Sequence, residues 1–171
     1  IRNVFINILN TLYSTDAKVS VLEPSFGSGE FILDIATQFP HSTIVGVEKN
    51  VDVFKKFQPK VGDLASQGLN NSTLINQDFL VFDTDERFDI IIGNPPYFQI
   101  PVQDKVKYQK EYPELMGKFD IYLIFLLKSI QLLKQDGVLL FVMPATFINT
   151  PSYDKVRRLI FNTMTILEVI N

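Results

Sequence analysis

The chain alternates short apolar runs with segments of helical pattern, and this alternation constrains its fold more than any other feature. The apolar runs are bounded by turn residues and are continuous rather than alternating, which is typical of strands buried on both faces. Strands are expected at Val19–Pro24, Thr43–Glu48, Thr73–Asp78, Asp89–Asn94 and Gly137–Pro144. Helices are expected at about Ile1–Ser14, Glu30–Gln38, Val51–Phe57, Phe119–Leu133 and Tyr153–Met164. The pattern predicts an α/β fold with a mostly parallel sheet and helices on both faces.

Length and composition indicate one globular domain over residues 1–171, with 46% hydrophobic and 20% charged residues. No apolar run approaches the ~20 residues that span a bilayer. The absence of cysteine excludes disulfides, thiolate zinc sites and a cysteine nucleophile. We therefore expect a cytoplasmic, intracellular protein without a membrane segment or a metal. The net charge of −3 offers no basic surface for a polyanion, and His41, the only histidine, is expected to be solvated.

The ends of the chain predict a fragment of a longer protein. The chain begins at Ile1, without a methionine or a signal-peptide pattern. Leu167–Asn171 has the pattern of an apolar strand in mid-course.

In a parallel α/β sheet, ligands bind beyond the carboxyl ends of the strands. The first strand ends in LEPSFGSGEF (Leu22–Phe31), where Gly27 and Gly29 allow a tight turn and a close approach of ligand to backbone. Position 32 is isoleucine, so this is not the dinucleotide motif G-x-G-x-x-G, and the glycines alone are explained as well by turn chemistry. The preceding Glu23 disfavours phosphate and suits a cationic ligand, since a buried unpaired carboxylate would be costly.

The second and third strand ends also carry acids. Glu48 is placed to accept hydrogen bonds from both hydroxyls of a ribose, although a solvated charge at a helix start is the plainer interpretation. Asp78 is placed to accept from an adenine amino group while Phe79 packs on the ring, and a turn cap beside a core phenylalanine is the alternative. Taken together, the three ends match S-adenosylmethionine, with its ammonium and sulfonium near Glu23, its ribose near Glu48 and its adenine near Asp78.

The fourth strand end, DIIIGNPPYF (Asp89–Phe98), predicts chemistry at an amino group. Asn94 offers a side-chain carbonyl and Pro95 a backbone carbonyl, and both precede a proline, which biases them to extended conformations. Two acceptors in a fixed relation can bind both hydrogens of a planar NH2 group, while Tyr97 stacks on its ring. The nitrogen lone pair is then drawn out of conjugation and becomes a nucleophile towards a methyl sulfonium.

EPSFGSGEF followed by NPPYF resembles the amino-methylating DNA methyltransferases, specifically the adenine-N6 group in which the cofactor motif comes first. The segment Lys118–Phe147 resembles the helix, strand and Pro-x-x-Phe that follow in that family. The resemblance implies a Rossmann-like, S-adenosylmethionine-dependent fold and the catalytic residues Asn94, Pro95, Pro96 and Tyr97. It implies cofactor contacts by Glu23, Pro24, Ser25, Phe26, Gly27, Gly29, Phe31, Glu48, Lys49, Asp78, Phe79, Asn94 and Phe125. For Phe125, a core phenylalanine in an apolar helix is the alternative.

The same resemblance implies that parts of the family's architecture lie outside this chain. These are a short motif before the first helix, an aromatic-bearing segment after the sixth strand, and the domain that recognises DNA. The expected partner is double-stranded DNA, bound through those missing regions, and the expected parent is a larger modification enzyme of the restriction–modification type.

Asn-Pro-Pro-Tyr also occurs in methyltransferases that act on a glutamine of release factors or on bases of RNA, so the motif specifies the nitrogen chemistry and not the polymer. Those enzymes more often begin the cofactor loop with Asp-x-Gly-x-Gly-x-Gly, whereas Glu-Pro-Ser-Phe favours DNA. A non-catalytic cofactor-binding subunit is a further alternative, and the intact Asn94–Tyr97 motif argues against it. Gln103–Lys118 is expected to be a mobile loop that orders over DNA or substrate, with a plain solvated loop as its alternative.

Overall fold

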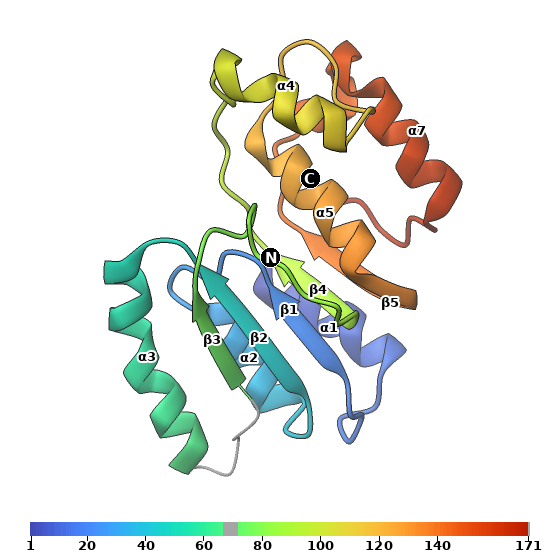
Figure 1. Cartoon of the computed structure of the whole chain (residues 1–171). Helices are drawn as coiled ribbons and strands as arrows, with labels where there is room; N and C mark the ends of the chain where they lie inside the picture. The colour runs from blue at the N-terminus through green and yellow to red at the C-terminus, as the bar shows by residue number, and fades with distance from the viewer. Residues whose placement is uncertain (67–71, 171) are drawn as a thin grey trace.

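The computed structural model describes residues 1–66 and 72–170 of the chain, and the fold in those residues is a five-stranded sheet covered by helices (Figure 1). The strands run in the order β3-β2-β1-β4-β5, and every neighbouring pair is parallel. Their bounds are Ser20–Glu23 (β1), Thr43–Glu48 (β2), Ser72–Asn76 (β3), Phe88–Gly93 (β4) and Leu133–Phe141 (β5). The chain moves outward from β1 to β3 and then returns to β4 on the other side of β1. This reversal creates a switch point between β1 and β4, where sheets of this kind bind ligands.

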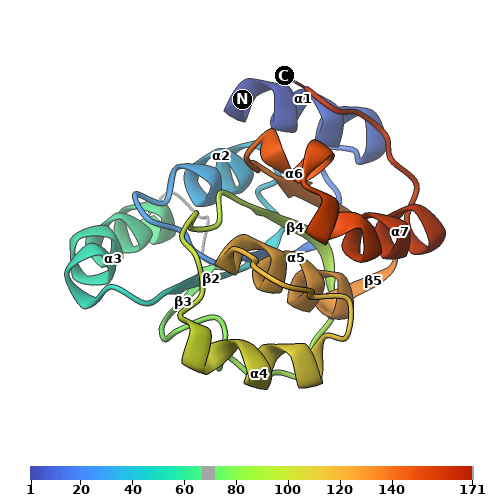
Figure 2. The ribbon, with the colours of Figure 1, turned by 90° about the horizontal axis from the view of Figure 1, so that it is seen from above.

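The helices lie on both faces of the sheet, with α1 and α2 on one face and α4 and α5 on the other (Figure 2). The bounds are Arg2–Leu12 (α1), Glu30–Gln38 (α2), Val51–Ser66 (α3), Val102–Glu111 (α4), Ile121–Leu132 (α5), Thr146–Asn149 (α6) and Asp154–Thr163 (α7), with a 3-10 turn at Pro151–Tyr153. Within the described residues, no helix is long and apolar enough to cross a membrane. The predicted α/β fold with a parallel sheet and helices on both faces is confirmed.

Two hydrophobic cores, one on each face, explain the continuous apolarity of the strands. Val21 and Ile90 point into the core beneath α1 and α2, whereas their neighbours Leu22 and Ile91 point into the core beneath α5. Most residues of the inner strands β1, β2 and β4 therefore have an apolar environment whichever way they point, as the sequence pattern predicts, whereas the outer strands β3 and β5 are partly exposed.

Three of the local predictions are wrong. The helix expected to end at Phe57 continues to Ser66 through Pro59, because Phe57 and Val61 on either side of the proline pack into the same core while Pro59 is exposed. The loop expected at Gln103–Lys118 contains the helix α4.

The third error is the strand expected at Leu167–Asn171. Asn171 lies outside the described residues, and Leu167–Ile170 form no regular structure. Leu167 instead lies beside Ile8 and Leu12 of α1, where it lines a shallow groove. An apolar run becomes a strand only where a neighbouring strand pairs with it, and this run has no such neighbour among the described residues.

Candidate active site

The carboxyl ends of β1, β2 and β4 are joined by hydrogen bonds between their loops. The Gly27 N–H donates to Glu48 Oε2 at 2.9 Å, which links the loop after β1 to the end of β2. The Ser25 hydroxyl donates to the backbone carbonyl of Asn94 at 3.3 Å, which links the same loop to the end of β4. Strand ends that are far apart in the sequence therefore form one continuous site.

The loop after β1 is shaped by Gly29, whose φ of 73° is rarely adopted by residues with a side chain. A Cβ at this position would lie 2.1 Å from the ring of Phe57. Phe57 in turn packs against Phe26 of the same loop, with ring centroids 5.1 Å apart. Gly27 also has a positive φ, 53°, but a Cβ there would meet nothing within 4 Å. The two glycines thus differ: one is required by packing and conformation, the other by conformation alone.

Glu23, the last residue of β1, is a buried acid that forms no ion pair within residues 1–66 and 72–170. Its side chain is 2% exposed, and Oε2 has no hydrogen-bond partner among the described residues. Burial raises the pKa of Glu23 well above its ordinary value, and a hydrogen bond from the backbone of Ile32 opposes this only in part. An unsatisfied buried acceptor of this kind costs about 1–3 kcal/mol. A cation placed against Oε2 would remove that cost, so the residues present fit the positively charged end of S-adenosylmethionine.

Glu48, at the end of β2, is held in place by two backbone amides. Oε2 accepts from Gly27, and Oε1 accepts from Asn50 at 2.7 Å. The side chain is therefore fixed rather than freely solvated. A carboxylate has about four acceptor positions, so two remain for the hydroxyls of a ribose.

Asp78, which follows β3, caps a turn and forms an ion pair. Oδ1 accepts from the Leu80 N–H at 3.0 Å, and Oδ2 lies 2.7 Å from Lys49 Nζ. The side chain of Phe79 is 1% exposed and packs against Phe125, with ring centroids 5.0 Å apart. The turn cap and the core phenylalanines named above as alternatives are therefore both present. Contact of these residues with an adenine stays a prediction.

The other residues predicted to contact the cofactor from this loop, Pro24 and Phe31, are both buried. Pro24 is buried and faces Gly93, where a Cβ would lie 3.5 Å from the Pro24 ring. The ring of Phe31 is buried and stacks on Phe5 of α1, with centroids 5.7 Å apart. Contact of Phe31 with the cofactor stays a prediction.

At the end of β4, Tyr97 lies directly against Asn94. The Tyr97 hydroxyl donates to Asn94 Oδ1 and to the backbone carbonyl of Val142, the latter at 2.9 Å. The Tyr97 side chain remains 46% exposed, and Asn94 is exposed as well. Of the two prolines between them, Pro95 is buried and Pro96 half-buried. The tip therefore presents an amide and an aromatic ring on a rigid base.

Sequence reasoning missed the aromatic cluster that supports this tip. Tyr122 of α5 meets the Tyr97 ring edge-on, with centroids 6.1 Å apart. It also contacts Phe147 and Tyr153, at 6.5 and 6.2 Å. The Tyr122 hydroxyl is buried beside the side chains of Tyr153 and Thr146, and burial raises its pKa. A tyrosine, the one polar side chain in the run IYLIFLL, was the available signal for this cluster.

The structure offers no metal site within residues 1–66 and 72–170, where no group of three or more potential ligand side chains gathers. His41 is exposed in the turn before β2, as expected.

The sheet order and the acidic, glycine-bearing strand ends together define an S-adenosylmethionine-dependent methyltransferase fold of class I. The structure superposes with a TM-score of 0.77 on the methyltransferase subunit of a type I restriction–modification system from Streptococcus thermophilus, at 20% identity over 95% of this chain and 37% of that one. A protein of Listeria monocytogenes assigned to the class I S-adenosylmethionine-dependent methyltransferases gives a TM-score of 0.74, at 20% identity over 94% of this chain and 50% of that one. The cofactor of this domain is S-adenosylmethionine.

The chain belongs to the Eco57I restriction-modification methylase family, whose sequence profile matches residues 31–171. Modification methylase CviBIII of Paramecium bursaria Chlorella virus NC1A is 36% identical over 149 residues, which are 86% of this chain and 36% of that protein. Type II methyltransferase M.TthHB8I of Thermus thermophilus is 33% identical over 150 residues, 80% of this chain and 32% of that protein. The chain thus spans about a third of the length of these relatives. The resemblance drawn from the two motifs is confirmed at the level of the restriction–modification methylases.

Proposed function

We propose that this chain is the catalytic domain of an enzyme that methylates the N6 amino group of an adenine flipped out of double-stranded DNA. The observation that carries the proposal is the joining of the NPPY tip to the cofactor loop, through the hydrogen bond from Ser25 to the backbone of Asn94. This contact sets the target amino group and the cofactor against the same short stretch of backbone. Membership of the restriction–modification methylases supports DNA as the polymer.

Three carboxylates would hold the cofactor, which supplies a methyl group made electrophilic by its positively charged sulfur. Glu23 would face the ammonium group, because its buried Oε2 needs a cationic or hydrogen-bonding partner. Glu48 would accept from the ribose hydroxyls with the lone pairs that Gly27 and Asn50 leave free. Asp78 would accept from the adenine amino group, where Lys49 now lies.

Asn94 and Pro95 would activate the target nitrogen. Their carbonyl oxygens accept the two N6 hydrogens, which draws the nitrogen lone pair out of ring conjugation and aims it at the methyl carbon. Bound S-adenosylmethionine would supply the methyl group and keep the electrons of the C–S bond on its sulfur, and the nitrogen held by Asn94 and Pro95 would lose one proton to solvent. Since the nitrogen becomes positive on the way, both acceptors bind the transition state more strongly than the ground state.

The exposed ring of Tyr97 would hold the flipped base. Extrusion of a base costs a few kcal/mol, and stacking on an aromatic side chain returns about 1–3 kcal/mol per base. We assign selection of the DNA sequence to regions of the protein outside this chain. We place the protein inside the cell, where its DNA substrate lies.

The proposal is tested by methyl transfer from radiolabelled S-adenosylmethionine with the protein in its full natural length. Duplex DNA, RNA and release-factor protein are offered as substrates, and the modified nucleoside is identified by mass spectrometry. N6-methyladenine in DNA is the expected product. Label in RNA, in protein, or at cytosine N4 would replace the proposal with one of its alternatives, and cofactor binding without any transfer would indicate a non-catalytic subunit.

A further inference from the structure

Helix α4 was not predicted from the sequence. It is joined to the catalytic tip by two paired segments, residues 98–100 and 119–121, which we call the neck. Phe98 accepts a hydrogen bond from the Ile121 N–H at 2.9 Å, and Ile100 donates to Phe119 at 3.4 Å. Gln99 and Asp120 pair between them as an antiparallel bridge. The chain after Tyr97 thus forms α4 and then returns to pair with the segment that precedes the helix. In Figure 1, α4 lies above the tips of the strands, on the side to which the site opens.

The helix has an inner and an outer face. On the inner face, Tyr108 packs against the core, Lys105 Nζ lies 5.8 Å from the ring centroid of Phe119, and Gln109 donates to the Leu115 carbonyl. The outer face, defined here as Val102, Gln103, Val106, Lys107 and Lys110, is exposed along its whole length.

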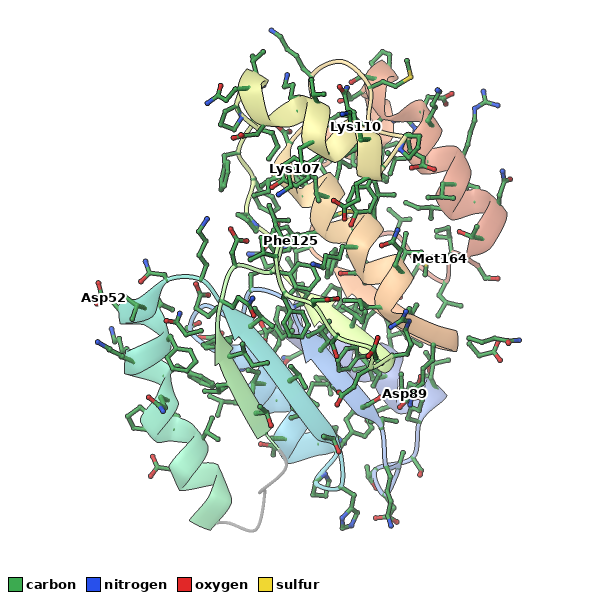
Figure 3. The ribbon with its side chains drawn as sticks, in the orientation of Figure 1. Asp52, Asp89, Lys107, Lys110, Phe125 and Met164 are labelled. Atoms are coloured by element: carbon green, nitrogen blue, oxygen red, sulfur yellow. The ribbon has the colours of Figure 1, made fainter. Side chains whose placement is uncertain are left out.

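Two features of the outer face suit contact with a partner, namely its exposed apolar residues and its exposed positive charge. Val102 and Val106 are 77% and 59% exposed, one helical turn apart, which leaves apolar surface in water. Lys107 and Lys110, labelled in Figure 3, form no ion pair with any described residue. Asp104 and Glu111 are on the same helix and, with Asp78, add to the effect of burial in raising the pKa of Tyr108. Lys107 Nζ lies 5.3 Å from the ring centroid of Tyr108, a contact that does not remove its charge, so both lysines keep an exposed positive charge.

The distribution of charge along the chain points to an anionic partner. Residues 1–93, which hold the cofactor acids, carry twelve acidic and seven basic side chains, a net of −5. Residues 94–164 carry nine basic and six acidic side chains, a net of +3. Glu168, in the last seven residues, brings the sum to the overall charge of −3, which thus combines an acidic cofactor half with a basic segment that follows the catalytic tip.

We propose that the outer face of α4 is a docking surface for the phosphate backbone of the DNA duplex next to the flipped base. Lys107 and Lys110 contact phosphates, and Val102 and Val106 pack on the sugars between them. The neck fixes α4 relative to Tyr97, so that these contacts set the position of the duplex while the target base lies against the tip. The inference rests on DNA as the substrate, but it concerns binding and not methyl transfer.

The test compares the salt dependence of DNA binding in full-length variants, with a short duplex of arbitrary sequence as the probe. Each lost phosphate contact lowers the slope of log affinity against log salt by about 0.9. Lys107→Gln/Lys110→Gln should therefore lower the slope by about 2, and Lys107→Arg/Lys110→Arg should restore it. The matched control is Lys18→Gln/Arg87→Gln, which removes the same charge at the amino ends of β1 and β4, at the opposite edge of the sheet. This control should leave the slope unchanged.

An unchanged slope in the α4 variant, or an equal change in the control, would overturn the proposal. Altered sequence preference with an unchanged slope would also overturn it, because α4 would then contact another part of the protein and not phosphate. Failure of the proposed function would be seen in a different measurement. The wild-type protein would then not methylate adenine, whatever the salt dependence of its DNA binding. If that occurs while only the α4 variant changes the slope, the docking surface stands and the assigned chemistry is wrong.

Discussion

The hydroxyl of Tyr97 donates a hydrogen bond to the side-chain oxygen of Asn94, so the residues that flank the proline pair are in direct contact. The same hydroxyl reaches the Val142 carbonyl at 2.9 Å. A phenol carries one proton and can fully satisfy only one acceptor at a time. When a target amino group occupies Asn94 Oδ1, the hydroxyl retains Val142 as its acceptor. The contact therefore keeps Asn94 in place without blocking it.

Asn94→Ala tests the acceptor directly. Loss of one preorganised polar group at a developing charge costs about 10²–10³ in rate. We expect the single-turnover rate of methyl transfer to fall by that factor, while cofactor affinity measured by calorimetry stays nearly unchanged. A near-normal rate in this variant would show that the side-chain carbonyl does not activate the nitrogen.

Substitutions of Tyr97 separate its ring from its hydroxyl. Tyr97→Ala removes the stacking surface and should weaken capture of the flipped base, seen as altered fluorescence of 2-aminopurine at the target position. Tyr97→Phe keeps the ring and loses one hydrogen bond, worth about 1 kcal/mol, so its rate should stay within roughly tenfold of wild type. Equal defects in the two variants would assign the role to the hydroxyl instead. Tyr13→Phe is the control, because its hydroxyl donates to the Asp89 carbonyl at 3.3 Å, near the amino end of β4 and away from the tip.

Glu48→Ala tests the ribose assignment. Hydrogen bonds to a charged acceptor are worth about 1.5–3 kcal/mol each, so the variant should bind S-adenosylmethionine at least tenfold more weakly by calorimetry. Glu48 also anchors Gly27 and Asn50, and Glu48→Gln serves as the control because it keeps an acceptor for one of them. Unchanged cofactor affinity in Glu48→Ala would remove the assignment.

Glu23 should couple folding and cofactor binding to pH. Its pKa in the folded protein is raised above the ordinary 4.5, so the folded state binds the proton more tightly than the unfolded state does. Stability of the cofactor-free protein should therefore decrease as pH rises from about that value through the folded pKa. Glu23→Gln should abolish this dependence and raise the melting temperature at neutral pH. The same variant should bind S-adenosylmethionine more weakly, since it cannot pair with a cation. A stable variant with full cofactor affinity would contradict the assignment of Glu23 to the ammonium group.

Gly29→Ala should destabilise the fold more than Gly27→Ala. Both substitutions force a side chain into a left-handed conformation, at about 1–2 kcal/mol. Only at position 29 would the new Cβ collide with Phe57, which adds the cost of overpacking, about 1–3 kcal/mol. Urea unfolding should show the difference, and Phe57→Leu should partly rescue Gly29→Ala. Equal effects at the two glycines would show that packing under Gly29 is unimportant.

The sequence by itself determined the α/β class and the succession of its five strands along the chain. Continuous apolar strands such as Asp89–Asn94 can be buried only between two helical layers, and that requirement is local to each segment. It also determined the candidate chemistry at Asn94 and Glu23, because parallel strands present all their carboxyl ends at one edge of the sheet.

Only the tertiary structure decided how those ends are connected and which side chains remain available. The hydrogen bonds from Ser25 to Asn94 and from Gly27 to Glu48 join residues far apart in the chain, so no local pattern contains them. Tertiary packing also explains why α3 continues beyond Pro59. Burial of Phe57 and Val61 outweighs the backbone hydrogen bond that a proline in a helix cannot make. The burial of Phe31 and the position of α4 were also decided by tertiary contacts. Phe31 packs on Phe5, and α4 is placed by the pairing of Gln99 with Asp120, and no local sequence pattern predicts either contact.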